Sequence, residues 1–427
     1  MKKTVVITSI ACITSLADDP ILLWEKLKEN NVGISKLEKF DSRRYPCTFG
    51  GVIHDFNFRD VNVQGKNIMN RTNQLEFYSV MKAFQNVHFS EKALEDCNLY
   101  LGNHIINIDI ETMEIMIKLC KERDNINFSK LGNNLRRMPP LNGVKLLPTT
   151  PSHFIAKENN LHGKGDVVYS SEISGIMSLL LAYKEIQNNN IDMAVVSSAY
   201  SPFTPHEFLW LCDQGLIRST PEDDDIKELI FPFDKRHNGI IYSEGSAAII
   251  LESEESAKKN NRKILAYVEG GAANIFAGET FYSLTERGFS KNIDITLEYS
   301  HLDKENIDLI FSNASSNRDW DNAEFKAIIN KWDENQVLIS NSKANLGYMG
   351  PTSGLLDCVL ATVSMNKNEY LPILNFKKDE TIFIDKGKHY INYKPTKELN
   401  RSLILNAGIG GSYSSVCLKS GEDFYER

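Results

Sequence analysis

The chain has 427 residues, enough to bury a large core as one big domain or as two closely packed halves. Its formal net charge is −8 at pH 7, and no basic run is clustered in the way that nucleic-acid binding needs. No stretch approaches the roughly 20 apolar residues that span a bilayer, so we expect neither a nucleic-acid nor a membrane partner.

Common cofactor motifs are also missing from the sequence. The seven cysteines stand singly, without a Cys-x-x-Cys pair, which is typical of reduced and mostly buried thiols. A His-Glu-x-x-His pair, a Walker phosphate loop and a Gly-x-Gly-x-x-Gly turn are absent. The sequence therefore predicts no dedicated metal or dinucleotide site.

The first residues allow two interpretations. The segment MKKTVVITSIACITSLADD imitates a signal peptide, with two lysines, an apolar stretch and Ala17 before two acids. However, its apolar core at residues 5–11 is short and interrupted by Thr8 and Ser9, which is poor for secretion. Its β-branched residues suit a buried first strand. We expect that strand, no cleavage near Ala17, and a cytoplasmic protein.

Residues 166–183, DVVYSSEISGIMSLLLAY, predict an elbow between a strand and a helix. A short apolar strand at 167–169 meets a polar turn, and an apolar helix opens at Ser174-Gly175. Glu172 stands at the elbow. Such an elbow usually displays a nucleophile or holds an anion, and a carboxylate suits neither task well.

Two pairs of segments resemble one another along the chain. Residues 191–199 are echoed by 307–314, and each is a continuous apolar run typical of a strand buried on both faces. The elbow and helix at 167–183 are echoed by 337–365, where Ser353-Gly354 opens the helix. Strands that alternate with buried helices, twice over, predict an α/β protein of two similar layered halves. We place the halves at 1–257 and 258–427, divided in a charged stretch.

Six landmarks in one order resemble those of the β-ketoacyl synthases. The opening strand and a helix carrying Trp24 are followed by Gly33-Ile34-Ser35 and then by the elbow at 170–175. A Pro-x-Asp…Gly…Glu-Gly segment follows, carried by Asp234, Gly239, Glu244 and Gly245. A Lys-x-x-x-Gly segment comes next, carried by Lys343, Gly347 and Gly354. The last landmark is a glycine-rich terminal loop with Gly408, Gly410 and Gly411. The resemblance covers nearly the whole chain. It implies the thiolase-like αβαβα five-layered sandwich of two duplicated halves.

The chemistry of that family needs a cysteine at the elbow and two histidines. The cysteine carries the acyl chain as a thioester, and the histidines help to decarboxylate the malonyl unit and stabilise the charge that develops. The matching positions here hold Glu172, Ser315 and Tyr348, and none of the nine histidines lies close in sequence to either vacant histidine position. The resemblance therefore implies no catalytic residue of the family kind.

We interpret Glu172 as a structural plug that accepts backbone N–H groups at the helix N-terminus. Lys343 keeps the family residue, and pairing with Glu172 across the vacated site would lower the cost of burying either charge. We interpret Gly410 and Gly411 as turn glycines in a loop, 408–412, that borders the vacated pocket. A functional alternative is that Glu172 acts as a general base or decarboxylating group.

A ketosynthase-like chain without these three residues resembles the chain-length factors of type II polyketide synthases. Those proteins form heterodimers with an active ketosynthase and cap a tunnel that measures the growing chain. The resemblance implies two partners, an active ketosynthase subunit and an acyl carrier protein. It implies no bound cofactor, since the phosphopantetheine arm of the carrier protein reaches the partner subunit. Chain-length factors usually carry Gln where this chain has Glu172, so an aromatic polyketide and a polyene system both stay open.

The measuring residues of such proteins align with a helix that begins within residues 107–120. The gate positions become Asp109, Thr112 and Met116, of which the last two are four apart and share a helical face. The methionines and isoleucines of this stretch are equally typical of plain core. We expect a second wall from the loop 201–210, near His206 and Phe208.

Two other functional classes stay open. One is an active enzyme, either a malonyl-carrier-protein decarboxylase or an unusual β-ketoacyl synthase that uses Glu172. The other is a stand-alone binding module for acyl chains, which would purify as a homodimer and would not depend on a ketosynthase chain.

Overall fold

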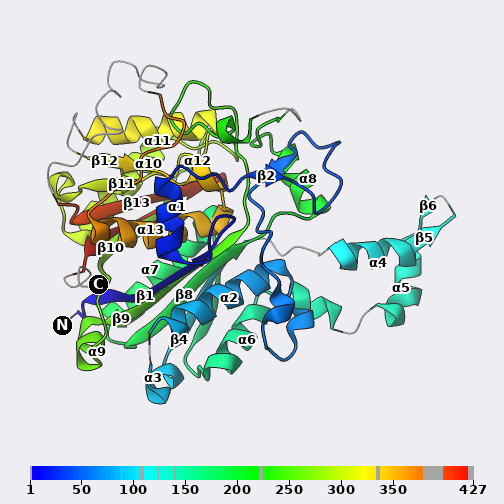
Figure 1. Cartoon of the computed structure of the whole chain (residues 1–427), viewed down its shortest axis with the longest axis horizontal. Helices are drawn as coiled ribbons and strands as arrows, with labels where there is room; N and C mark the ends of the chain where they lie inside the picture. Colours follow the sequence, from blue (N-terminus) through cyan, green and yellow to red (C-terminus); the bar gives the residue numbers. More distant parts are fainter. Residues whose placement is uncertain are drawn as a thin grey trace.

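A computed structural model describes residues 2–87, 89–104, 110–123, 125–138, 141–220, 225–332, 337–377 and 398–421. Within these ranges, ten strands form one sheet in the order β12-β11-β13-β14-β10-β1-β9-β8-β4-β7 (Figure 1). Their bounds are β1 Val5–Ile13, β4 Asn98–Asn103, β7 Gly165–Tyr169, β8 Met193–Tyr200, β9 Gly245–Ser253, β10 Ala266–Ile275, β11 Leu309–Phe311, β12 Leu338–Ser340, β13 Arg401–Gly408 and β14 Ser412–Ser420.

The sheet consists of two similar halves that meet at its centre. On one side β7, β4 and β8 are parallel, and β9 and β1 continue antiparallel. On the other side β12, β11 and β13 are parallel, and β14 and β10 continue antiparallel. Only Val5–Ile7 of β1 pair with β10 at the junction. The strand order therefore reads the same from either edge, as expected of a duplicated fold.

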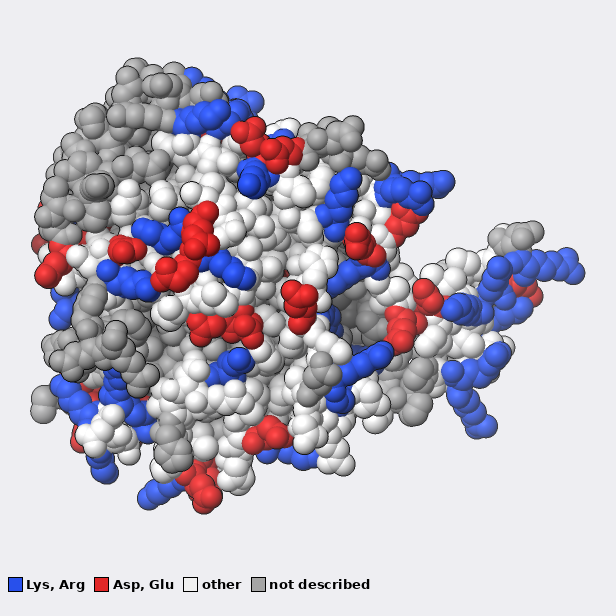
Figure 2. All heavy atoms as spheres, viewed as in Figure 1, with Lys and Arg blue, Asp and Glu red and all other residues white. Residues whose placement is uncertain are grey.

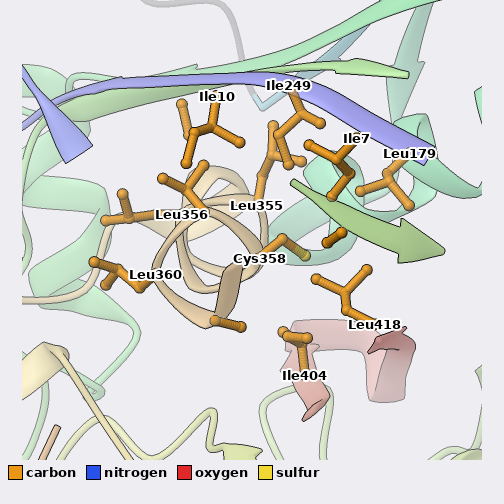
Figure 3. Close-up of a cluster of buried hydrophobic side chains, with 14 of the residues drawn as sticks. Ile7, Ile10, Leu179, Ile249, Leu355, Leu356, Cys358, Leu360, Ile404 and Leu418 are labelled. Atoms are coloured by element: carbon orange, nitrogen blue, oxygen red, sulfur yellow. The ribbon is translucent and has the colours of Figure 1, made fainter. Parts of the chain in front are cut away.

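Helices make three further layers around the two half-sheets. The middle layer is α7 and α13, which contact strands of both halves, while α2 packs on β9, β1 and β8 and α10 packs on β10 and β14 with α11 beside it. Figure 3 shows α13 surrounded by apolar side chains from both halves, among them Ile10 and Ile404. The αβαβα five-layered sandwich is therefore confirmed. The bounds are α2 Arg71–Gln85, α7 Ser174–Gln187, α10 Glu286–Ser300, α11 Arg318–Lys331 and α13 Ser353–Lys367.

One of the two expected echoes joins strands that are not equivalent. Residues 193–200 form β8, third from its edge of the sheet, whereas residues 309–311 form β11, second from the opposite edge. The counterpart of β8 is β13, and that of β11 is β4. The other echo is right, because β7 with α7 corresponds to β12 with α13. The error arose because every strand buried on both faces reads as an apolar run.

The first strand occupies the centre of the sheet. All nine residues of β1 are buried, and β1 lies between β9 and β10. The expected buried strand at the start of the chain is confirmed. In the parts of the chain that the structure describes, no helix combines the length and apolar character needed to cross a membrane.

All seven cysteines are free thiols, and six of them are buried. Burial raises the pKa of Cys97 to about 12, and the pKa values of Cys417 and Cys358 are raised for the same reason. These thiols stay protonated at neutral pH and behave as small core residues, as the sequence indicates.

An arm projects from the body between β4 and the edge strand β7 (Figure 1). It contains α4 Ile110–Cys120, β5 Lys121–Glu122, β6 Asn125–Ile126 and α5 Ser129–Asn134. Figure 2 shows Lys and Arg side chains along it. Phe128 is 74% exposed and Leu135 61% exposed, so apolar side chains of the arm also face solvent.

Candidate functional site

The elbow forms where the edge strand β7 passes into α7. A 3-10 turn, η5 Ser171–Ile173, lies between them, and Ser171 adopts a left-handed backbone with φ of 53°. Glu172 is 5% exposed. Its Oε2 accepts the N–H of Ile409 at 3.0 Å and the hydroxyl of Ser171. The helix α7 has no side-chain cap. The expectation that Glu172 caps α7 is therefore wrong, and its backbone partner lies 237 residues away.

The glycine-rich loop packs directly against Glu172. Gly408 ends β13, and a Cβ added to it would lie 2.1 Å from Oε2 of Glu172, so the close approach requires glycine. Gly410 and Gly411 follow with φ of 75° and 66°, the left-handed region that glycine adopts without strain. The loop therefore lies beside the elbow because three glycines permit the turn.

The other two positions that the resemblance marks as vacated also gather around the end of β13. Tyr348 is 1% exposed, and its hydroxyl donates to the carbonyl of Ala407 at 3.3 Å. Asn313 Oδ1 accepts the N–H of Ala407 at 3.2 Å. Two residues further on, the N–H of Ser315 donates to Asp321 Oδ1 at 3.0 Å, while its buried hydroxyl has no hydrogen-bond partner among the described residues. The sheet thus brings Glu172, Ser315 and Tyr348 to one place.

A row of aromatic rings crosses this place. Successive ring centroids lie 6.2, 5.8, 6.4, 5.6 and 6.2 Å apart along Trp320, Tyr348, Tyr242, Tyr200, His104 and Trp210. Burial and then the Glu172 carboxylate raise the pKa values of Tyr348 and Tyr242 well above the ordinary value. The tyrosines therefore stay neutral, and the Glu172 carboxylate faces neutral phenol groups.

Lys343 does not pair with Glu172, which corrects that expectation. Its ammonium forms an ion pair with Asp357 and donates to the carbonyl of Ser312 at 2.8 Å. Both side chains of the pair are almost fully buried. Asp357 lies one turn into α13, and the sequence contains no signal that would have distinguished it from Glu172 as the partner.

Glu244, one of the resemblance landmarks, is the centre of a buried polar cluster. Its carboxylate accepts from Lys39 at 2.8 Å, from Arg71 at 3.0 Å, from the Ser201 hydroxyl at 2.7 Å and from the N–H of Ile53 at 3.0 Å. Burial acts to raise the pKa of Glu244, but the two cations outweigh it and lower this pKa to about 2. The carboxylate therefore joins four separate segments and has a structural role.

The structure brings two histidines near the vacated positions. His104 follows β4 and lies in the aromatic row; burial lowers its pKa, while the nearby Glu172 carboxylate acts in the opposite direction. His237 has Nδ1 4.0 Å from Oδ2 of Asp321, the residue that also holds the N–H of Ser315. The sequence did not indicate either histidine as a neighbour of these positions, because His104 lies 68 residues before Glu172 and His237 lies 78 residues before Ser315.

The expected gate residues on α4 lie in the projecting arm. Asp109 is outside the described residues. Thr112 is buried, and its Oγ1 accepts from the amide of Asn142 at 3.0 Å. Met116 is half-buried four residues further along α4. That these residues measure a chain stays a prediction.

The second expected wall is a helix and not a loop. Thr204 caps α8, Pro205–Asp213, and Pro205 occupies its first turn, a start signal that the sequence contains. His206 is exposed. Phe208 is fully buried, with ring centroids 5.7 Å from Phe40 and 6.2 Å from Phe203. Within one chain, Phe208 is therefore part of a local aromatic core.

Comparisons with known proteins agree with this geometry. The family model described as "Beta-ketoacyl synthase, N-terminal domain" matches residues 2–257, and "Beta-ketoacyl synthase, C-terminal domain" matches residues 265–377. The chloroplastic 3-oxoacyl-[acyl-carrier-protein] synthase I of Arabidopsis thaliana is 25% identical over 98% of this chain and 87% of its own length.

Two solved structures share the fold over 98% of this chain and 100% of theirs, each at 18% identity. One is the ishigamide ketosynthase/chain length factor, with a TM-score of 0.84. The other is AntDE:AntF, a type II polyketide synthase acyl-carrier protein in complex with its ketosynthase bound to the hexaketide, with a TM-score of 0.83. At this identity the likeness shows the fold alone.

Proposed function

Because the chain belongs to the β-ketoacyl synthase family yet holds Glu172, Ser315 and Tyr348 at the three catalytic positions, we propose that it is a non-catalytic subunit of the chain-length-factor kind. The observation that carries the proposal is Tyr348, which is buried between Tyr242 and Trp320 and hydrogen-bonded to the backbone. The single proton of that hydroxyl is already donated to the carbonyl of Ala407, so it is not free to stabilise the charge that develops in decarboxylation. An acyl group on Glu172 would be a mixed anhydride, much less stable than a thioester.

The edge strand β7 supports pairing with a second chain. It pairs with β4 on one side only, and among the described residues no strand covers its other side. Its residues are half-buried or exposed, whereas the neighbouring strand β4 is fully buried. Unpaired strand edges recruit a further strand by backbone hydrogen bonds. An active ketosynthase subunit that pairs here would place its own site near the elbow.

The carrier protein and the cellular location complete the proposal. An acyl carrier protein would deliver malonyl units to the active partner, and its phosphopantetheine arm would reach that partner, so this chain needs no cofactor of its own. We place the protein in the cytoplasm, because cleavage near Ala17 would remove the central strand β1. The mass of the intact protein tests this location.

Reconstitution with a ketosynthase chain that has an intact Cys-His-His set tests the function. We expect the two chains to co-purify, product formation to require both, and this chain alone to release no carbon dioxide from malonyl-loaded carrier protein. Product formation by the ketosynthase alone, at the same rate and length, would contradict the proposal. Isolation of only a stable homodimer would favour the stand-alone binding module.

A second candidate function has one observation in its favour. His104 is buried, and the Glu172 carboxylate lies near enough to act on its pKa, so an acid and a base share this part of the fold. A decarboxylase built on this pair would release carbon dioxide from malonyl-loaded carrier protein without a partner. That release would disappear in both Glu172→Ala and His104→Ala.

A further inference from the structure

A cavity lies beside the vacated site, between α2, the ends of β4 and β8, and the edge strand β7. Its walls include Asn73, Asn103, His104, Tyr169 and Tyr200, with Lys145 at the rim. The cavity is small: the space open to the centre of a water-sized molecule is about 20 Å³, room for about one or two waters. Only a short group or the tip of a longer molecule fits.

Several buried polar atoms in this wall have no hydrogen-bond partner within the described residues. They are Nδ2 of Asn73, Oδ1 of Asn103 and Nδ1 of His104, on residues that are 6%, 7% and 9% exposed. Glu76 lies behind them, is 0% exposed, and has the side chain of Asn103 as its hydrogen-bonding neighbour, with no other partner among the described residues. Buried polar groups are nearly always paired in folded proteins, so this concentration indicates a polar occupant.

The cavity is close to neutral in charge. Burial raises the pKa of Glu76 to about 8, so this group is mostly a neutral carboxylic acid at pH 7. Burial also lowers the pKa of His104, which favours the neutral imidazole. Lys145 is the one cation among the described residues that line the cavity. A neutral occupant therefore fits better than a phosphate or a carboxylate, which would need buried positive charge.

We propose that this cavity binds a neutral oxygen-bearing group, a ketone carbonyl or a hydroxyl. The Asn73 amide would donate to the oxygen, Asn103 Oδ1 would accept from a hydroxyl, and His104 can do either. A hydrocarbon group in the same place would leave all three atoms unpaired, which disfavours saturated and polyene occupants.

The source of the group is either the chain on the partner subunit or a free small molecule. Tyr169 belongs to β7, the strand through which we propose pairing, and His104 also borders the vacated site, so the position favours the partner's chain. Assigning the bound group to the partner's chain rests on the proposed function. The polar cavity would then place that growing chain in the class that retains keto or hydroxyl groups.

Two probes of equal length test the assignment, β-ketooctanoyl and octanoyl pantetheine amide, which cannot transfer an acyl group. Their affinities are measured by calorimetry on the full chain alone and on the reconstituted pair. We expect the β-keto probe to bind on the order of tenfold more tightly or better. Asn103→Leu and His104→Phe should abolish or reverse that preference. Asn366→Leu is the control, because Asn366 is also buried and has an unpartnered side-chain oxygen but lies away from the cavity. This variant should keep the preference for the β-keto probe.

Each result decides a separate point. A preference seen only in the pair identifies the partner's chain, and a preference in the chain alone identifies a free ligand. Equal or tighter binding of the octanoyl probe, a preference unchanged in both cavity variants, or no binding of either probe (a cavity filled by water only) would overturn the inference. A variant that loses its cooperative unfolding is replaced by Asn103→Ser. Failure to form a pair would count against the proposed function, while the preference of the chain alone still decides the cavity.

Discussion

Glu172 joins two parts of the chain that the sequence keeps far apart. Its carboxylate holds the N–H of Ile409 in the glycine-rich loop, and Gly408 lies against its side chain. A cysteine thiol would be shorter and would accept hydrogen bonds only weakly. The acid therefore stabilises the closed arrangement of elbow and loop, which is a structural role.

Replacing Glu172 separates this role from catalysis. Glu172→Gln keeps an oxygen that can accept from Ile409, so we expect little change in stability. Glu172→Ala leaves that N–H unpaired and should cost about 1–3 kcal/mol of unfolding free energy. Product formation by the reconstituted pair should survive both changes. A fall in turnover of about a hundredfold, roughly 2.7 kcal/mol of barrier, in an assembled pair would contradict the proposed function.

The buried Lys343–Asp357 ion pair makes a second prediction at this scale. Asp357→Asn leaves the Lys343 ammonium buried without its counter-charge, and we expect a loss of about 3–5 kcal/mol. The double variant Lys343→Met, Asp357→Leu removes both charges and should recover most of that loss. Denaturant unfolding of the three proteins measures it. A single variant that is no less stable than the double variant would show that the pair is solvated in solution.

Glu244 predicts the response to acid. Its pKa in the folded protein is about 2, below its ordinary value of 4.5, so the unfolded chain binds more protons between these values. Stability from this group is present above pH 4.5 and is lost as the pH falls toward 2, by at most about 1.4 kcal/mol per pH unit. Glu244→Gln should be less stable than wild type at pH 7, and the gap should shrink in acid. Thermal unfolding across this range measures the gap; a constant gap would contradict the shift.

At the scale of elements, the arm carries the expected gate. Met116 lies on α4 and is half-buried within one chain, so the structure leaves it able to contact a partner as well. Ile117, the next residue, is 47% exposed and points elsewhere on the helix, because adjacent residues of a helix do not share a face. The two side chains therefore form a matched pair for mutation.

If Met116 projects into the tunnel, Met116→Trp should shorten the product and Met116→Ala should lengthen it or broaden its distribution. A chain stops where the next two-carbon unit would overlap the wall, and such overpacking costs roughly 1–3 kcal/mol. Ile117→Ala should leave the carbon count unchanged. Mass spectra of products from the reconstituted pairs give the readout. A stability loss of about 2–5 kcal/mol with unchanged products would instead identify Met116 as ordinary core.

At the scale of the whole molecule, the two edges of the sheet belong to corresponding strands, β7 and β12. They differ in surroundings, since β12 is buried whereas β7 is half-buried or exposed. Among the described residues, β7 is therefore the exposed edge, and a second chain that adds to it would extend the sheet.

A charge on β7 should therefore weaken assembly and spare the fold. Val168→Lys places a lysine on the edge strand, and we expect co-purification with the ketosynthase to fall by about tenfold or more with an unchanged circular dichroism spectrum. Ile275→Lys is the control, because Ile275 is 79% exposed at the end of β10, away from that edge. Equal loss of pairing in both variants would mean that β7 is not the contact.

Local patterns in the sequence were sufficient for the duplicated α/β architecture. The elbow and its helix at Ser174, the buried first strand and the equivalence of β7 with β12 all follow from periodicity and from paired small residues, which act over a few neighbouring positions. The expectation that the family's three catalytic residues are replaced likewise rests on single positions, Glu172, Ser315 and Tyr348, and stays a prediction.

Partners across the sheet were decided by the tertiary structure alone. Ile409 as the donor to Glu172, Asp357 as the partner of Lys343, and His104 beside the vacated site depend on which strand ends meet. An apolar run has the same appearance in every strand buried on both faces, which is why β8 and β11 were matched wrongly. Strand order and the packing of α13 between the half-sheets set these contacts, because they join residues whose spacing along the chain carries no periodic signal.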